Sequence, residues 1–295
     1  QTVQVGDRRL QISNLEKILY PQSGFTKGQM LDYYARVAPV LLPHLAGRPL
    51  TRKRYPNGVD GQSFFEKNAP RGTPDWVRTV TLPVPGSTKN RDTIDFVVVD
   101  GLATLVWAAN LASIELHVPQ WRVDDEGQRQ SPDRLVIDLD PGAPAGLREC
   151  AQVALMVRER LDDLGLDLFP VTSGSKGMQL YATLPGDLTS DQTRDLAQQL
   201  AQELTKKHPE LVVWKMTKSL RPGKVFLDWS QNVAAKTTIC PYSLRGKETP
   251  TVAAPRTWDE VSAAAEDREA LQQLEFDEVL DRLEASADPL AQLLG

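Results

Sequence analysis

Short apolar segments that suit buried strands alternate with amphipathic segments of helical period through the centre of this chain. Residues 134–142 (RLVIDLDPG) are apolar and close in a Pro-Gly turn, which is typical of a strand. Residues 146–164 and 189–207 carry apolar side chains at helical spacing. Between them, LFPVTSGSKGMQLYATL predicts two strands joined by a Gly-Ser loop. This interleaving predicts an α+β (mixed α/β) fold.

Other segments flank this centre. Residues 26–46 predict a helix that begins at Thr26, and residues 101–113 predict a second, mostly buried helix. The remaining expectations are extended segments at residues 114–123, 224–232 and 236–244, a strap or linker at the Pro-rich residues 249–258, and short helices in the acidic tail.

Composition excludes several classes of protein. A chain of 295 residues that is 41% hydrophobic can bury a core of its own. Its two cysteines cannot build a disulfide framework, and its three histidines, without CxxC or HxxxH spacing, argue against a zinc site. No apolar run approaches about 18 residues, which argues against a membrane span. The N-terminal residues lack the apolar centre of a signal peptide, although the mature form of a processed chain stays open. We therefore expect a soluble, cytoplasmic protein.

The charge is unevenly distributed. The net charge is −5, but residues 257–295 alone carry −9, which leaves +4 on residues 1–256. The basic residues of that larger part form two clusters, namely Arg48, Arg52, Lys53 and Arg54, and then Lys215, Lys218, Arg221, Lys224, Lys236, Arg245 and Lys247. Phosphate-binding surfaces have this pattern, and so do solvated loops, so charge alone leaves both interpretations open.

Two aspartates in VIDLDPG form the most informative chemical pattern. On a strand, Asp138 and Asp140 point to the same face, where their like charges repel unless a cation lies between them. Oxygen ligands of this kind suit Mg²⁺ or Mn²⁺. The alternative is a strand end with two solvated carboxylates. A third strand-borne carboxylate, Asp228 in VFLDWSQN, favours a two-metal site for phosphoryl or nucleotidyl transfer.

Three further patterns are weaker individually. In TSGSKG, residues 172–177, backbone N–H groups and Lys176 predict an anion-binding nest, although most Gly-Ser loops are only turns. Neither a Walker A loop nor a Rossmann glycine motif occurs in the chain. Arg221 and Arg245 lie near turns and suit phosphate, or else surface ion pairs. Phe64 and Phe65 beside a basic stretch predict a base-stacking ring, or else a local satellite core.

Taken in order, the motifs carry a resemblance to a known family. They are ISNLEKILYP, TRKRYPNGVDGQSFFEK, LVIDLDPG, VTSGSKG, MTKSLRPGKVFLDWSQN and PYSLRG. This ordered set covers nearly the whole chain and resembles the polymerase domain of the bacterial end-joining ligase LigD, within the archaeo-eukaryotic primase superfamily. A K-x-D-G ligase motif is missing from the sequence, so we do not expect this chain to ligate DNA.

The resemblance implies a role for each motif residue. It implies that a DNA-directed polymerase adds ribo- or deoxyribonucleotides to 3′ ends in gap filling and end joining. The implied metal ligands and catalytic residues, for Mn²⁺ or Mg²⁺, are Asp138, Asp140 and Asp228. The implied nucleotide-binding residues are His117 near the sugar, and Ser173, Lys176, Gln179, Arg221, Gln231 and Arg245. The implied DNA-binding residues are Asn14, Lys17 and Lys27 for a recessed 5′-phosphate, Lys53 for the template strand, and Phe64 and Phe65 for template bases. Gln179 departs from the family, whose motif has a histidine there.

The resemblance also implies a fold, a domain organisation and partners. The implied fold is a primase-like core with an RRM-like sheet, a second sheet and flanking helices. We expect a catalytic domain at 1–256, with a DNA-end-binding part at about 1–130 and a metal and nucleotide core at about 131–248. The acidic tail, 257–295, is expected to pack on the same unit. The implied partners are DNA ends and gaps with a 5′-phosphate, NTPs or dNTPs, a DNA ligase and Ku, at the nucleoid. A catalytically silent DNA-end-binding protein and a different metal-dependent phosphotransferase, such as a nuclease, remain as alternatives.

Overall fold

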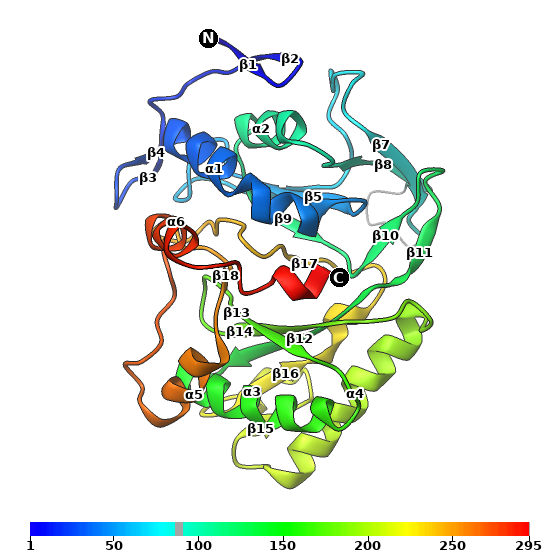
Figure 1. Ribbon diagram of the computed structural model, residues 1–295, viewed down its shortest axis with the longest axis vertical. Coiled ribbons are helices and arrows are strands. Elements are labelled where there is room, and N and C mark those ends of the chain that lie inside the picture. Colours follow the sequence, from blue (N-terminus) through cyan, green and yellow to red (C-terminus); the bar gives the residue numbers. More distant parts are fainter. Residues whose placement is uncertain (86–90, 295) are drawn as a thin grey trace.

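Two sheets lie one above the other along the long axis of the molecule, with helices on their outer faces (Figure 1). This computed structural model describes residues 1–85 and 91–294. The upper sheet in Figure 1 has the strand order β17-β9-β5-β8-β7, with β6 paired to β5, and the lower sheet has the order β15-β16-β12-β14-β13-β18. The predicted α+β class is confirmed.

The strands are short, and most pairs in the two sheets are antiparallel. The upper sheet consists of β5 (Pro49–Arg54), β6 (Phe64–Glu66), β7 (Thr79–Pro83), β8 (Thr93–Val98), β9 (Ser113–Val118) and β17 (Thr238–Ile239). The lower sheet consists of β12 (Arg134–Pro141), β13 (Leu168–Thr172), β14 (Met178–Thr183), β15 (Val212–Val213), β16 (Val225–Asp228) and β18 (Ala254–Pro255). Separate pairs are β1 (Thr2–Val5) with β2 (Arg8–Gln11), β3 (Ile18–Tyr20) with β4 (Phe25–Thr26), and β10 (Trp121–Val123) with β11 (Arg129–Pro132).

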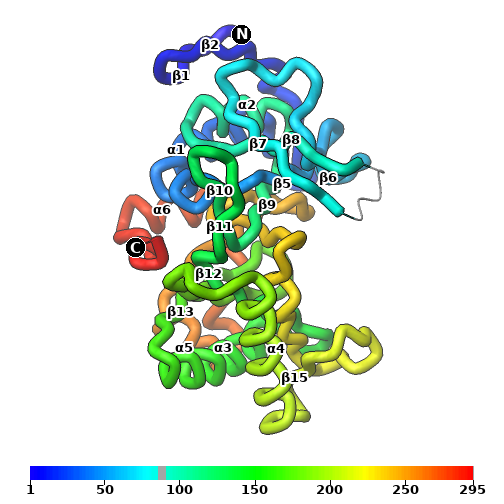
Figure 2. The backbone as a smooth tube through the Cα atoms, turned by 90° about the vertical axis from the view of Figure 1, so that its right-hand side faces the viewer, coloured from blue at the N-terminus to red at the C-terminus, as the bar shows by residue number. Residues whose placement is uncertain are grey.

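The helices cover the two outer faces (Figures 1 and 2). The upper sheet is covered by α1 (Lys27–Leu45) and α2 (Leu102–Asn110), and the lower sheet by α3 (Leu147–Asp162), α4 (Ser190–Lys207) and α5 (Trp258–Glu266). The others are α6 (Phe276–Ala285) and the 3₁₀ turns η1 (Lys218–Leu220), η2 (Trp229–Asn232) and η3 (Ala291–Leu294). Thr26 caps α1 and Thr189 caps α4, each in a capping box. Within residues 1–85 and 91–294, no helix combines the length and apolar character that a membrane crossing requires.

Alternation along β12 determines which side chains face which layer. Leu135, Ile137 and Leu139 are fully buried in the core that the lower sheet forms with α3, α4 and α5. Val136 points the other way and packs in the core that includes the upper sheet. Tyr181 of β14, opposite Val136, belongs to that same core. The even-numbered side chains of β12 therefore face the upper sheet.

Three predicted segments differ from the observed elements. Residues 224–232 are not extended throughout: β16 ends at Asp228, whose side chain accepts the N–H of Ser230 and begins the turn η2. Residues 236–244 contribute only the short strand β17. Residues 249–258 are not a free linker, because β18 pairs with β13 and extends the lower sheet. In the acidic tail, side chains such as Val279 and Leu290 pack in the core that includes the upper sheet, while the domain division at residue 256 stays a prediction.

Candidate active site

Three aspartates share one face of the lower sheet. Asp138 lies directly opposite Asp228 in the pairing of β12 with β16, and directly opposite Gln179 in the pairing of β12 with β14. Asp140 follows two residues later on the same strand. Because directly opposed residues and alternate residues share a face, all four side chains face the upper sheet. The face predicted for Asp138 and Asp140 agrees with this register, and strand pairing brings Asp228 beside them. We call these three aspartates the carboxylate face.

Burial and repulsion between the aspartates of the carboxylate face shift the pKa of Asp138. Burial and the charges of Asp228 and Asp140 raise the pKa of Asp138 to about 7, against a hydrogen bond from Gln179. That bond joins Gln179 Nε2 to Asp138 Oδ1 at 3.0 Å. Among the described residues, the cation in ion-pair contact with these aspartates is Arg221, with NH1 3.3 Å from Asp140 Oδ2. The carboxylate face thus holds more negative charge than its neighbours balance.

The donor set of the carboxylate face fits a hard divalent cation. It offers carboxylate oxygens, and the buried Oε1 of Gln179 has no hydrogen-bond partner among the described residues. Two oxygens of Asp228 are turned to local donors: Oδ1 accepts from Ser230 Oγ at 2.6 Å, and Oδ2 from Gln231 Nε2 at 2.9 Å. In this arrangement, no three acidic, histidine or cysteine side chains of the described residues converge on one point. Reorientation of these side chains is needed for them to share an ion.

The Gly-Ser loop after β13 is a tight turn whose N–H groups are partly used. Gly174 has a φ of +70°, and a Cβ there would lie 2.6 Å from Arg245 Cγ, so the loop needs glycine at this position. The N–H groups of Ser173, Gly174 and Ser175 all donate within the protein, Gly174 to Gln273 Oε1 at 2.7 Å. These three N–H groups are therefore not free to bind an anion, and the loop offers fewer anion donors than the motif TSGSKG predicted. Lys176 has no ion-pair partner among the described residues.

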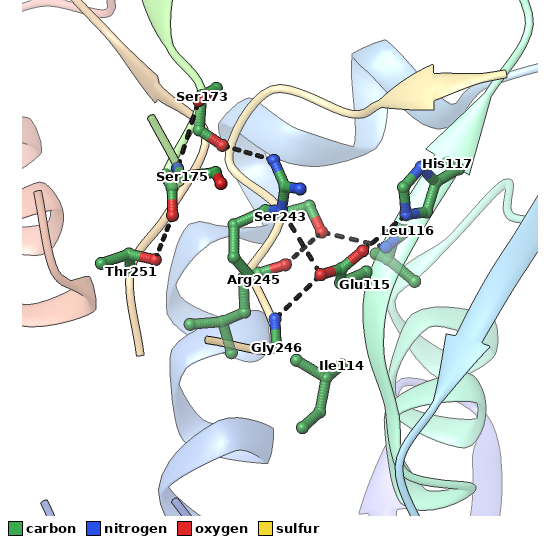
Figure 3. Close-up of polar contacts among 12 residues, drawn as sticks. Ile114, Glu115, Leu116, His117, Ser173, Ser175, Ser243, Arg245, Gly246 and Thr251 are labelled. Atoms are coloured by element: carbon green, nitrogen blue, oxygen red, sulfur yellow. Dashed lines mark hydrogen bonds and ion pairs between the residues drawn. The ribbon is translucent and has the colours of Figure 1, made fainter. Parts of the chain in front are cut away.

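Arg245 connects this loop to the upper sheet through Glu115 (Figure 3). Its NH1 donates to the carbonyl oxygen of Ser173 at 2.6 Å, and its Nε lies 3.4 Å from Glu115 Oε1. Glu115 Oε2 lies 2.8 Å from His117 Nε2. Glu115 is not among the residues predicted from the sequence. An acidic residue two positions before a histidine in an apolar strand was the available signal, since such residues share a face.

Arg221 and Gln231, whose nucleotide-binding role stays a prediction, each contact an aspartate of the carboxylate face. Arg221 also donates from NH2 to the carbonyl oxygen of Met216 at 2.8 Å, and its guanidinium lies 3.9 Å from the centroid of the Phe226 ring. Gln231 donates to Asp228 and accepts from Thr238. Both side chains would have to exchange these partners for a phosphate.

The two phenylalanines of β6 do not form one platform. Phe65 lies opposite Lys53 and Phe64 opposite Arg54, so they point to opposite faces of the upper sheet. Phe65 is 54% exposed and packs edge-on against His117, with Lys53 over its ring. Phe64 is 42% exposed beneath Arg54. Neither ring is core, which excludes the satellite-core interpretation, and Phe65 shares a face with His117.

The first basic cluster is not a continuous surface. Arg48 and Arg52 are fully buried. Arg48 pairs with Asp133 at 2.8 Å, and Arg52 pairs with Glu66 at 3.2 Å. Only Lys53 and Arg54 of that stretch reach solvent in part. The phosphate-binding interpretation of this cluster is therefore wrong for its two buried arginines.

Asn14, Lys17 and Lys27 come together at the start of α1. The carbonyl oxygen of Asn14 accepts the N–H of Lys17, and the carbonyl oxygen of Lys17 accepts the N–H of Lys27. Burial and the charge of Lys17 lower the pKa of Lys27. Lys17 Nζ donates to the carbonyl oxygen of Pro56 at 2.5 Å, and no carboxylate pairs with either lysine among the described residues. Backbone N–H groups at this helix start are already used by Lys17 and Leu15 carbonyls, so the side chains carry any anion affinity.

Comparisons with known proteins agree with this architecture. The sequence pattern of the LigD primase-polymerase domain matches residues 26–290. The chain is 48% identical over 285 residues to the multifunctional non-homologous end joining protein LigD of Mycolicibacterium smegmatis, covering 97% of this chain and 36% of that protein. It is 36% identical over 282 residues to the bifunctional LigD of Bacillus subtilis, covering 95% of this chain and 43% of that protein. The chain thus spans less than half the length of these relatives.

A solved structure extends the comparison to the fold. The polymerase domain from Mycobacterium tuberculosis Ligase D in complex with DNA superimposes with a TM-score of 0.91 at 46% identity, covering 98% of this chain and 99% of that one. The match therefore spans both sheets and the elements that position the carboxylate face. On these sequence and structural matches, the chain belongs to the LigD primase-polymerase domain family.

Proposed function

We propose that this chain is a DNA-directed nucleotidyltransferase that adds ribo- or deoxyribonucleotides to DNA 3′ ends in gap filling and end joining. The observation that carries the proposal is the carboxylate face, where three aspartates on adjacent strands stand with one arginine contact. Family membership and the likeness to a polymerase domain solved with DNA support it. The substrates are DNA ends with a 5′-phosphate and NTPs or dNTPs.

Asp138, Asp140 and Asp228 would hold Mn²⁺ or Mg²⁺ at a two-metal site. When bound, these ions would lower the barrier to attack by the primer 3′-hydroxyl and neutralise charge on the pyrophosphate leaving group. The protein supplies no nucleophile of its own. To hold the cations, Asp140 and Asp228 would have to give up their present contacts with Arg221 and Gln231. The guanidinium and the amide would then be free to donate to the triphosphate.

The remaining nucleotide contacts come from both sheets. Ser173, Lys176 and Arg245 hold the triphosphate at the loop after β13, and Gln179 orients Asp138. His117, on the opposing sheet, lies near the sugar. The Lys176 ammonium is a point charge suited to phosphate oxygens.

DNA contacts come from the N-terminal half. Asn14, Lys17 and Lys27 hold a recessed 5′-phosphate at the start of α1. Phe65, beside Lys53, stacks on a template base, and Lys53 contacts the template backbone. The stacking of Phe64 on a template base stays a prediction, because Phe64 points to the opposite face of β6, beneath Arg54. A DNA ligase and Ku would act with this chain at the nucleoid in the cytoplasm.

Primer extension tests the proposal. The assay uses a gapped duplex with a labelled primer and a downstream 5′-phosphate, with NTPs or dNTPs, and Mn²⁺, Mg²⁺ or a chelator. We expect templated extension that needs a divalent cation. Binding without extension in any condition would instead indicate an end-binding protein. Metal-dependent shortening of the primer would indicate a nuclease.

A further inference from the structure

Glu115 is a buried carboxylate that joins the two sheets at the proposed nucleotide site (Figure 3). Its side chain is 3% exposed. Oε1 accepts the N–H of Gly246 at 2.9 Å and lies 3.4 Å from Arg245 Nε, while Oε2 faces His117 Nε2 at 2.8 Å. One carboxylate thus holds a histidine of the upper sheet and the arginine that reaches the loop of the lower sheet.

The protonation state of this group follows from its partners. Burial alone would raise the pKa of Glu115, but the hydrogen bond from His117 and the charge of Arg245 outweigh it and hold the pKa well below its ordinary value. An ionised carboxylate only accepts hydrogen bonds, so His117 Nε2 must carry the hydrogen. Burial also lowers the pKa of His117, although Glu115 opposes the shift, which keeps the ring neutral at pH 7.

A neutral ring with its hydrogen on Nε2 has a lone pair on Nδ1. Among the described residues, no hydrogen bond engages His117 Nδ1. Phe65 packs edge-on against the ring, with 5.5 Å between the ring centroids. The ring is therefore fixed on one side by Glu115 and flanked by Phe65, and its free nitrogen is a hydrogen-bond acceptor. A sugar hydroxyl is a suitable donor for it.

We propose that Glu115 is a positioning residue that sets ribose selectivity: it holds His117 in the Nε2–H form, so that Nδ1 accepts a hydrogen bond from a ribose hydroxyl, and it holds Arg245 toward the triphosphate loop. The hydroxyl in question is the 2′-hydroxyl. A deoxyribose lacks it, so a dNTP leaves Nδ1 of His117 without a hydrogen-bond partner. The inference rests on the proposed function and deepens it, because it names the groups that distinguish NTPs from dNTPs. Sugar selection and triphosphate binding are then coupled through one carboxylate.

The first experiment reads the histidine tautomer without any nucleotide. The chain has three histidines, so long-range ¹H–¹⁵N correlation spectra of the metal-free protein can be assigned with a His117→Ala variant. We expect the Nε2–H form for His117. In Glu115→Gln, the amide oxygen stays with Gly246 and Arg245 and the amide nitrogen faces His117, so we expect the hydrogen to move to Nδ1. A wild-type His117 that is charged, or that carries its hydrogen on Nδ1, would overturn the proposal.

The second experiment measures kcat/KM for NTP and for dNTP in Glu115→Ala, His117→Ala and the double variant. We expect the NTP preference to fall about tenfold in each single variant, and no further in the double variant, because Glu115 selects the sugar through His117. Glu115→Gln, where the expected loss is smaller, replaces Glu115→Ala if that variant does not fold.

Glu260→Gln is the matched control. Glu260 also binds two arginines, Arg256 and Arg282, but it lies on α5, outside the face shared by the two sheets. We expect its selectivity and His117 signals to equal those of the wild type. An unchanged NTP preference in the Glu115 variants, or additive losses in the double variant, would overturn the proposal. A wild-type chain that extends no primer would overturn the proposed function and the selectivity with it, while the tautomer spectra still decide the Glu115–His117 contact.

Discussion

The face of β12 that looks toward the upper sheet carries opposite charge at its two ends. At the start of the strand, Arg134 is 2% exposed and lies near the fully buried Arg48. These cations have partners: Arg48 pairs with Asp133, and Arg134 donates to Gln120 and lies over the Tyr181 ring. At the other end, Asp138 and Asp140 stand with Asp228 and share one arginine contact.

The two ends of β12 differ in how their charge is balanced. Arg48 has a carboxylate partner, whereas the three aspartates of the carboxylate face share one arginine contact among the described residues. Burial and Arg134 lower the pKa of Arg48 to about 9, but the adjacent Asp133 opposes the shift, and both groups keep their charge near pH 7. The Arg48 pair thus resembles a buried ion pair that holds two elements together. In the carboxylate face, burial and the charges of Asp228 and Asp140 raise the pKa of Asp138, and no described cation pairs directly with Asp138. Clustered carboxylates that lack balancing cations favour the binding of a divalent cation, because the cation relieves their repulsion.

The largest expected effect is on the carboxylate face. Asp138→Ala or Asp140→Ala should reduce nucleotide addition at least about 10³-fold, because each removes a proposed ligand of the divalent cations. Single-turnover primer extension with Mn²⁺ measures the loss.

Two controls accompany these variants. DNA binding and the free energy of unfolding of the metal-free protein should stay near wild type, because the substitution removes a mutually repelling charge. Either variant extending primers at a near wild-type rate would contradict the metal assignment.

A substitution near the start of β12 should lower stability and leave activity nearly unchanged, which is the reverse of the effect expected for Asp138 and Asp140. Arg48→Met should lower the free energy of unfolding by about 2 kcal/mol, because Asp133 loses its buried partner and keeps Arg122, which is partly exposed. Urea unfolding measures the change. Extension per folded molecule should stay within about twofold of wild type.

The Arg48 variant has its own contradicting outcome. A change in stability below about 1 kcal/mol, or a loss of activity in fully folded protein, would remove the distinction between the two ends of the strand. Arg8→Met is a surface control, because the partners of Arg8 among the described residues are the exposed Asp7 and the ring of Trp76.

The two ends of β12 also show which features of the site can be predicted from the sequence and which depend on the fold. Alternation within VIDLDPG predicts the common face of Asp138 and Asp140, because period two is a local property. It cannot predict that Asp228 pairs opposite Asp138, since the register between two strands so far apart in sequence depends on packing. For the same reason, the sequence could not predict that Arg48 and Arg52 are buried and paired with carboxylates. Arg48 sits in a basic stretch, and its partner Asp133 is brought to it only by the fold.

Side-chain contacts within short segments set a further limit. WSQN was predicted to continue a strand, but Asp228 accepts the N–H of Ser230 and turns the chain into η2. The contact of Glu115 with His117 had a local signal in the sequence, but its contact with Arg245, 130 residues away, depends on the fold. Helices with capping boxes, α1 and α4, were the elements that local sequence predicts most closely.

The lysine pair at the start of α1 is the positively charged counterpart of the carboxylate face. Lys17 and Lys27 are like charges without a carboxylate partner among the described residues, so they should favour an anion as the carboxylate face favours a cation. Wild type should bind a gapped duplex with a downstream 5′-phosphate about tenfold more tightly than one with a hydroxyl. Lys17→Ala combined with Lys27→Ala should abolish that difference, measured by anisotropy at a fixed moderate salt concentration.

Lys206 and Lys207 on α4 provide a control for net charge. Their double alanine variant removes the same charge at a distant helix end, and it should weaken binding to both duplexes equally. Equal affinity of wild type for the phosphorylated and unphosphorylated ends would contradict the pocket.

The smallest expected effect adds a cation to the carboxylate face. Gln179 contributes a neutral hydrogen bond to Asp138, and the family pattern has histidine at this position. Gln179→His should lower the KM for NTP severalfold at pH 6.5, because a neighbouring carboxylate favours the imidazolium, and charge-assisted hydrogen bonds contribute about 1.5–3 kcal/mol against about 1 kcal/mol for neutral ones. Gln179→Ala should raise that KM while DNA binding holds, because Asp138 loses the donor that orients it. Steady-state extension kinetics across NTP concentrations measure both. If both variants match wild type, residue 179 contributes neither to triphosphate binding nor to the orientation of Asp138, and the described cations that oppose the negative charge at this end of β12 are Arg221, in contact with Asp140, and Arg245, whose charge acts on Asp138.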